Sequence, residues 1–148
     1  MTIENALRHY MLEQKEIRNV FGNHIYAGRI PQGETPAIAA LITRTATKRY
    51  YDLAEEAGIV TPSLNIEFVT KANNGAALAM RAAEQVRLKV SSYRGNWGPA
   101  HDQIMIHSCA VEQDVMTEPV FFADGSRWTF TYSMLLRISH EQTSVATP

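Results

Sequence analysis

The stretch that decides the fold runs from Asn74 to Asn96, NGAALAMRAAEQVRLKVSSYRGN. Its apolar residues recur at steps of three and four, the period of one face of an α-helix. They are Ala76, Ala79, Met80, Ala83, Val86, Val90 and Tyr93. Asn73 or Asn74 can cap the start of this helix, and Gly95 can end it in the left-handed conformation. We therefore expect a helix whose alanine-rich face packs closely on a sheet.

The rest of the chain supplies one more helix and the strands of that sheet. A second helical stripe runs from Ile3 to Phe21, with Thr2 as its N-cap and Gly22 at its end. A short strand follows at Ile25. The segment Ala37 to Thr70 reads as one long β-hairpin whose turn includes Gly58, and Pro62 within it predicts an edge strand or a bulge.

Two closing strands complete the pattern, Gln103 to Val111 and a run of alternating residues from Arg127 to Ile138. The sequence predicts an α+β fold: a mostly antiparallel sheet, two helices packed on one face, and a projecting hairpin. The expected inner face of the sheet consists of Ile38, Ile42, Leu64, Ile66, Phe68, Trp128, Phe130, Tyr132, Leu136 and Ile138. The expected helix residues that cover it are Leu7, Met11, Ile17, Met80, Val86 and Val90.

Length and composition fit one globular domain, which we place at residues 1–139, followed by a flexible C-terminal tail at residues 140–148. Hydrophobic residues make up 45% of the 148 and charged residues 20%. With 14 Lys and Arg against 15 Asp and Glu, the net charge of −1 disfavours a protein that captures nucleic acid through its phosphates. The charged N-terminus and the absence of a long apolar run predict a cytoplasmic protein without a signal peptide or membrane span.

The sequence offers little that would support catalysis or metal binding. Cys109 is the only cysteine, so it cannot form an intramolecular disulfide, and a buried, inert thiol is favoured over a nucleophile activated by His107. His101 and His107 are the only histidines close enough in sequence to test as metal ligands, and no third ligand accompanies them. No glycine-rich phosphate loop precedes a helix. We therefore predict no catalytic residue, no metal and no cofactor.

The polar tip of the hairpin is the candidate functional surface. Apolar alternation stops after Ile42, yet residues that favour strands continue as far as Tyr51. The basic and aromatic run from Thr47 to Tyr51 suits a protein–protein contact, while single-stranded nucleic acid and a plain solvated hairpin remain alternatives. The candidate contact residues are Arg44, Lys48, Arg49, Tyr50, Tyr51, Glu55 and Glu56.

These elements, taken together, resemble a known family. The segment Ile25 to Ile38, IYAGRIPQGETPAI, is similar to the strand and loop that follow the first helix in tail-completion and tail-terminator proteins of long-tailed, siphovirus-like bacteriophages. The long hairpin, the alanine-rich helix ending near Ser92–Gly95 and the two closing strands follow in the same order. The resemblance covers Ile3 to Ser139, and the chain departs from it at Met116 to Phe122 and in the C-terminal tail.

The resemblance implies a virion structural protein and not an enzyme. Members of the family form homohexameric rings that end the tail tube and join the tail to head-completion or neck proteins. Their implied partners are further copies of the chain, the major tail-tube protein and a neck protein, while DNA passes through the channel without specific binding. The implied location is the virion tail or neck, assembled in the host cytoplasm. Two alternatives stay open: another neck protein, such as a head-completion or connector subunit, and a small ligand-binding or enzymatic α+β domain.

Overall fold

Three helices and seven strands form in the part of the chain described by the computed structural model, residues 1–29, 38–51, 56–71, 75–116, 120–121 and 128–141. The helices are α1 (Ile3–Glu13), α2 (Lys15–Phe21) and α3 (Gly75–Val90). The strands are β1 (Ile25–Ala27), β2 (Ile38–Tyr51), β3 (Glu56–Thr70), β4 (Gly95–Trp97), β5 (Ile104–Met116), β6 (Val120–Phe121) and β7 (Trp128–Glu141).

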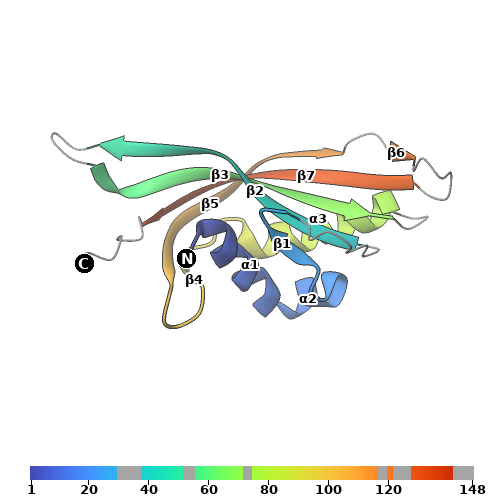
Figure 1. The fold of residues 1–148 in the computed structure, drawn as a ribbon, viewed down its shortest axis with the longest axis horizontal. Helices are drawn as coiled ribbons and strands as arrows, with labels where there is room; N and C mark the ends of the chain where they lie inside the picture. Colours follow the sequence, from blue (N-terminus) through green and yellow to red (C-terminus); the bar gives the residue numbers. More distant parts are fainter. Residues whose placement is uncertain (30–37, 52–55, 72–74, 117–119, 122–127, 142–148) are drawn as a thin grey trace.

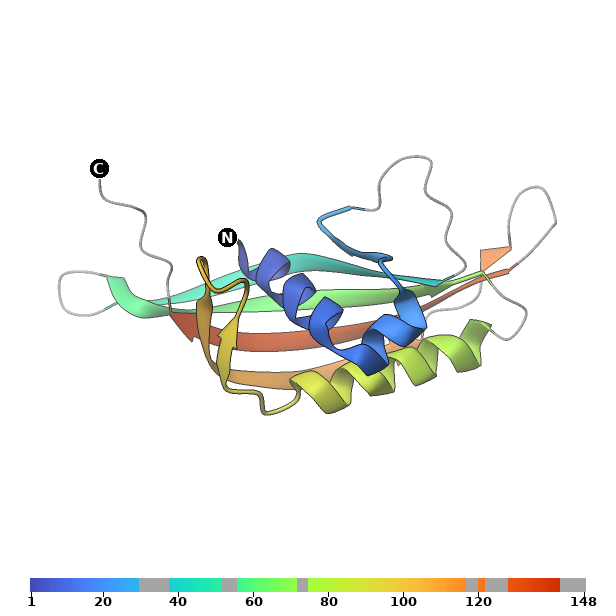
Figure 2. The same cartoon turned by 90° about the horizontal axis from the view of Figure 1, so that it is seen from below.

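The strands lie in the order β1-β2-β3-β7-β5-β4, and β6 pairs with the start of β7. Among the described strands only β1 and β2 pair in parallel, and the other pairs are antiparallel. All three described helices cover the same face of the sheet, and none of the described residues forms a helix on the other face (Figures 1 and 2). The predicted α+β class and the one-sided helix layer are therefore confirmed, with three helices instead of two.

The core lies between the helices and the inward-pointing residues of the four long strands. Period-2 alternation on the strands and period-3.6 alternation on the helices meet in one apolar cluster, as expected. Its fully buried members include Leu7, Met11, Ile17, Ile42, Leu64, Ile66, Phe68, Val86, Val90, Leu136 and Ile138. Met80 was expected among them but is 54% exposed, since the buried face of α3 centres on Ala79, Ala82, Ala83 and Val86.

The first helical stripe is two helices and not one. Thr2 caps α1 as predicted, with its Oγ1 accepting the Asn5 N–H at 3.2 Å, and Gly22 ends α2 at φ 59°. Between them Gln14 is extended, and its side-chain Nε2 donates to the Tyr10 carbonyl at 3.3 Å. Gln14 falls on the apolar stripe between Met11 and Ile17, where an unbroken helix would turn this polar side chain toward the core.

The long helix ends earlier than predicted. It stops at Val90, and Ser92 takes the left-handed conformation (φ 62°) that was expected of Gly95. The Ser92 N–H donates to the Cys109 carbonyl at 2.8 Å, which turns the chain back along β5 and lets Gly95 begin β4. Tyr93 still points to the core side because its ring contacts Tyr10 at a centroid distance of 4.8 Å. Because Tyr93 packs on the core side, it lies in the apolar three- and four-residue pattern of the helix although it lies beyond the helix end.

The hairpin spans the predicted residues, but its second strand begins earlier than the sequence indicated. β3 already begins at Glu56, so Gly58 lies within a strand and not in the turn. Pro62 does not mark an edge strand, because β3 lies between β2 and β7. Pro62 pairs with Thr47, and the nearby register shift lies in β2, between Arg44 and Ala46. Because proline has no N–H to donate, the ladder of β3 with β7 is interrupted between Val60 and Ser63.

Both closing strands also extend further than predicted. β5 continues past Val111 to Met116, and β7 continues to Glu141, two residues beyond the expected domain boundary. His140 is 6% exposed and therefore belongs to the core. The expected caps Asn73 and Asn74, residue Glu55 and the tail from residue 142 lie outside the described residues, as do the side chains of Trp128 and Phe130.

Candidate subunit interface

One side of the sheet ends in a long strand with few partners, β2. β1 pairs with it only at Ala40 to Ile42, and the last bond there runs from the Gly28 N–H to the Ile42 carbonyl at 2.9 Å. Within the described residues no strand pairs with the outer side of β2 from Thr43 to Tyr51. This stretch, called here the β2 free edge, presents backbone N–H and C=O groups that can pair with another strand.

The opposite side of the sheet ends in a similar way at β5. β4 pairs with Ile104 to Ile106, and Ser92 bonds to Cys109. From Val111 to Met116 no described strand pairs with the outer side of β5, and this stretch is the β5 free edge. The two edges differ in charge: the β2 free edge holds Arg44, Lys48 and Arg49 with no acid, and the β5 free edge holds Glu112 and Asp114 with no base.

The predicted contact residues do not all lie in one place. Lys48, Arg49, Tyr50 and Tyr51 form the end of β2, and Glu56 begins β3 opposite Tyr51. β7 ends at Glu141 opposite Ile59, so the hairpin beyond this point has only its own two strands and extends past the helices (Figure 1). Glu55 lies outside the described residues. An interface role for these residues stays a prediction.

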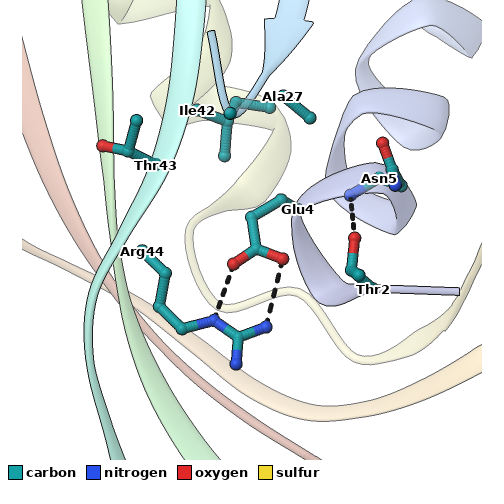
Figure 3. Close-up of a pocket in the computed structure, with 8 residues that line it drawn as sticks. Thr2, Glu4, Asn5, Ala27, Ile42, Thr43 and Arg44 are labelled. Atoms are coloured by element: carbon teal, nitrogen blue, oxygen red, sulfur yellow. Dashed lines mark hydrogen bonds and ion pairs between the residues drawn. The ribbon is translucent and has the colours of Figure 1, made fainter.

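Arg44 is placed differently, on the helix side of β2 and against α1 (Figure 3). Its Nε lies 2.6 Å from Glu4 Oε1 and its Nη2 lies 3.1 Å from Glu4 Oε2, while Nη1 is 3.4 Å from Thr47 Oγ1. Burial alone would raise the pKa of Glu4, but the Arg44 hydrogen bonds and charge hold it below its usual value. Arg44 therefore pairs within its own chain and is not available for the predicted intersubunit contact. The spacing of residues in the sequence could not predict this pair, because Glu4 lies 40 positions earlier.

Beside this ion pair lies a shallow cavity of about 290 Å³, called here the corner pocket (Figure 3). Three segments build it: the start of α1, the end of β1 and the middle of β2. Its lining residues are Thr2, Glu4, Asn5, Ala27, Gly28, Ile42, Thr43 and Arg44. Ala27 and Ile42 supply apolar surface, and the Glu4–Arg44 pair forms a polar rim. The corner pocket adjoins the point where the β2 free edge begins.

The outward side of α3 carries the other unexpected feature. Met80 is 54% exposed and Leu88 is 60% exposed, with Glu84 between them at the same helical spacing. We call these three residues the α3 stripe. Glu84 forms a double ion pair with Arg87. The sequence did not predict the α3 stripe, because Met80 has the spacing of a core residue. Leu88 gave no signal either, since leucine favours helices at exposed positions as well as at buried ones.

The face of the sheet without helices is polar but weakly charged. Its residues are small or uncharged along β3, β7 and β5, and they include Ser63, Asn65, Thr131, Ser133, Ser139 and Gln113. Glu112 is paired with Arg137 at 3.0 Å, and Glu67 accepts a hydrogen bond from Asn65 at 3.4 Å.

His107 and Cys109 do not form a catalytic pair. The register shift between Ile106 and Ser108 turns Cys109 into the core, where burial raises the pKa of its thiol to about 12. His107 instead reaches Glu141, with Nε2 3.5 Å from Oε1. Across the described residues, no group of three or more His, Cys, Asp and Glu side chains could hold a metal ion. A helix long and apolar enough to span a membrane is likewise lacking in that part of the chain.

The same architecture occurs in a solved virion structure. A chain of the structure described as "Virion of native gene transfer agent (GTA) particle" is similar to this one, with a TM-score of 0.68 and 12% sequence identity. The alignment covers 94% of each chain. No protein-family model and no curated protein matches the sequence. At this identity the likeness establishes a shared fold over nearly the whole length.

Proposed function

We propose that this chain is a structural virion protein whose copies join head to tail in a closed, homohexameric ring. In this proposal the ring ends a phage tail tube and joins it to the neck. The observation that carries the ring is the pair of free edges, one on each side of the same sheet and opposite in charge. A long free edge in a lone subunit invites uncontrolled aggregation. A ring pairs every edge with the next copy and leaves none open.

The sense of the strands favours this assembly. β2 runs opposite to β3, β3 opposite to β7, and β7 opposite to β5, so β2 and β5 run in opposite directions. Rotation about a ring axis preserves these directions, and β5 of one copy therefore meets β2 of the next as an antiparallel pair. Lys48 and Arg49 then lie opposite the strand that holds Glu112 and Asp114, which favours this pairing over the pairing of an edge with itself.

The positions of the free edges also match the tilt of strands in a barrel. Arg44, Leu64, Leu136 and Val111 lie on one line across the sheet, as do Arg49, Val60, His140 and Ile106. Measured along the strands, the centre of the β2 free edge is thus offset by about five residues, or roughly 17 Å, from the centre of the β5 free edge. Four strands are about 19 Å wide, so pairing the edges tilts the strands by about 40°, within the usual range of 35–45°.

A ring of this kind gives the helix-free face a role. Helices packed on the outside leave the polar face toward the axis, and barrels of 16 to 18 strands already enclose a water-filled channel. Twenty-four strands from six copies would enclose a wider one. A face lined mainly by small and uncharged residues, on a chain of net charge −1, lets DNA pass because it offers few phosphate contacts to hold it.

The position in the particle rests on the resemblance to tail-terminator proteins and on the shared fold with a virion chain. The proposed partners are the major tail-tube protein and a head-completion or neck protein. The proposed role is to bind these proteins and not to catalyse a reaction. A ring elsewhere in the neck, as a head-completion or connector subunit, would have the same symmetry. Binding to purified tail tubes separates the two, because a terminator caps the tube end and a connector does not.

A charge-swap experiment tests the proposal. The variant K48E/R49E should fold but form fewer rings and cap fewer tubes, and so should E112K/D114K. A chain that carries all four substitutions should regain rings, since each interface again joins opposite charges. Light scattering and electron microscopy measure both steps. Normal rings from K48E/R49E alone would show that this edge does not contact another copy.

A further inference from the structure

The two most exposed large apolar side chains of the described residues both lie on the outward face of α3. Met80 and Leu88 are 54% and 60% exposed, and each lies one helical turn from Glu84. A helix on the outside of a lone subunit needs no apolar residues at such positions. These two side chains give α3 an exposed apolar surface that a neighbouring copy can cover.

A hollow that could accept one of these side chains lies on the opposite side of the same molecule. The corner pocket of about 290 Å³ has Ala27 and Ile42 as apolar lining. Its rim is held in place because the Arg44 guanidinium donates two hydrogen bonds to the Glu4 carboxylate. Asn5 and Thr43 also line the pocket (Figure 3). The pocket suits an unbranched apolar chain that passes between polar neighbours, which describes methionine.

The ring proposed above determines which residue would reach the pocket. α3 ends beside Cys109, where the Ser92 N–H donates to the Cys109 carbonyl, and its body runs along β7 and β5 toward the C-terminal end of β5 (Figure 2). The N-terminal half of α3, which holds Met80, therefore lies beside the far end of the β5 free edge. In the offset register, that far end meets the next copy near Arg44, where the corner pocket opens.

We propose that Met80 of one copy inserts into the corner pocket of the next copy, between its α1, β1 and β2. This contact rests on the proposed head-to-tail ring and adds a side-chain anchor to the edge pairing. The occupant is a second copy of this chain, because the pocket adjoins the basic β2 free edge and Met80 adjoins the acidic β5 free edge. Each copy offers both halves of the contact, as a ring requires.

Cysteine pairs test the contact directly. In M80C/N5C the two thiols lie on different surfaces of one copy but meet across the interface, so a short thiol cross-linker should give a ladder up to six chains on a denaturing gel. M80C/N19C is the matched control, because Asn19 is exposed on α2 away from the corner pocket. It should give no ladder. The native Cys109 is 3% exposed, so it does not compete.

Two further variants make the proposal falsifiable without cross-linking. M80E places a charge in the contact and A27F fills the pocket, and each should raise the dissociation constant of the ring at least tenfold while the melting midpoint of the monomer is unchanged. Rings that form without the M80C/N5C ladder, or that tolerate both M80E and A27F, would overturn the contact and leave the ring standing. A ladder that stops at two chains would indicate a twofold dimer and overturn both. Failure to form rings at any concentration, with or without tube ends, would also overturn both.

Discussion

Replacing Glu4 by glutamine should destabilise the chain by about 1.5–2.5 kcal/mol. The change keeps the shape of the side chain but removes the charge that accepts two hydrogen bonds from Arg44, at 2.6 and 3.1 Å. An exposed ion pair contributes about 0.2–1 kcal/mol, and this one should exceed that range slightly because the Glu4 side chain is only 15% exposed. Glu4 also lies in the first turn of α1, where a negative charge adds about 0.3–1 kcal/mol.

A double-mutant cycle isolates the pair from the helix effect. E4Q, R44Q and E4Q/R44Q are unfolded in urea at a concentration where the chain is a monomer, and the coupling free energy should be about 1–1.5 kcal/mol. The folded state lowers the pKa of Glu4, so the coupling is present above pH 4.5 and is lost as the pH falls through the lowered value. A coupling below about 0.3 kcal/mol at pH 7 would refute the argument that this pair holds the corner pocket in shape.

Three other changes should have measurable effects. F68A removes a fully buried ring that contacts Phe21 and should lower the free energy of unfolding by about 3–5 kcal/mol in urea titrations; an unchanged midpoint would contradict the core assignment. G98A should cost about 1–3 kcal/mol by calorimetry, since φ is +112° and a Cβ would lie 2.6 Å from the Asp102 carbonyl oxygen, and a neutral result would mean that the turn can relax. Burial lowers the pKa of His140 below 6.5, so stability should fall as the pH drops below about 7, and H140Q should lose that dependence; equal pH profiles for the two proteins would count against it.

The fold was predictable where a repeating pattern meets a single buried face. Leu64, Ile66 and Phe68 alternate without interruption, and all three point to the core. Local patterns failed where a distant contact decided the outcome. Tyr93 has helical spacing because it packs on Tyr10, and Ser92 leaves the helix because its N–H bonds to Cys109, 17 positions later. Neither contact leaves a trace in the neighbouring sequence.

The candidate interface was predictable only in part. The end of apolar alternation after Ile42 indicated a hairpin that leaves the core, and the structure has it. The β5 free edge was missed because Glu112, Gln113 and Asp114 are charged or polar, as residues of a loop usually are. A strand has a free edge when no other strand pairs with it. The periodicity of a single sequence shows which residues form a strand, but it does not show which strands pair.

The central claim is a closed head-to-tail ring, and the mass and symmetry of the purified assembly test it most directly. Six copies of a 16.6-kDa chain should give particles of about 100 kDa, visible as rings by electron microscopy of the protein alone or bound to tail-tube ends. Head-to-tail joining predicts rotational symmetry with an open centre. A largest species that is a monomer or a twofold dimer, both alone and with tube ends present, would contradict the claim.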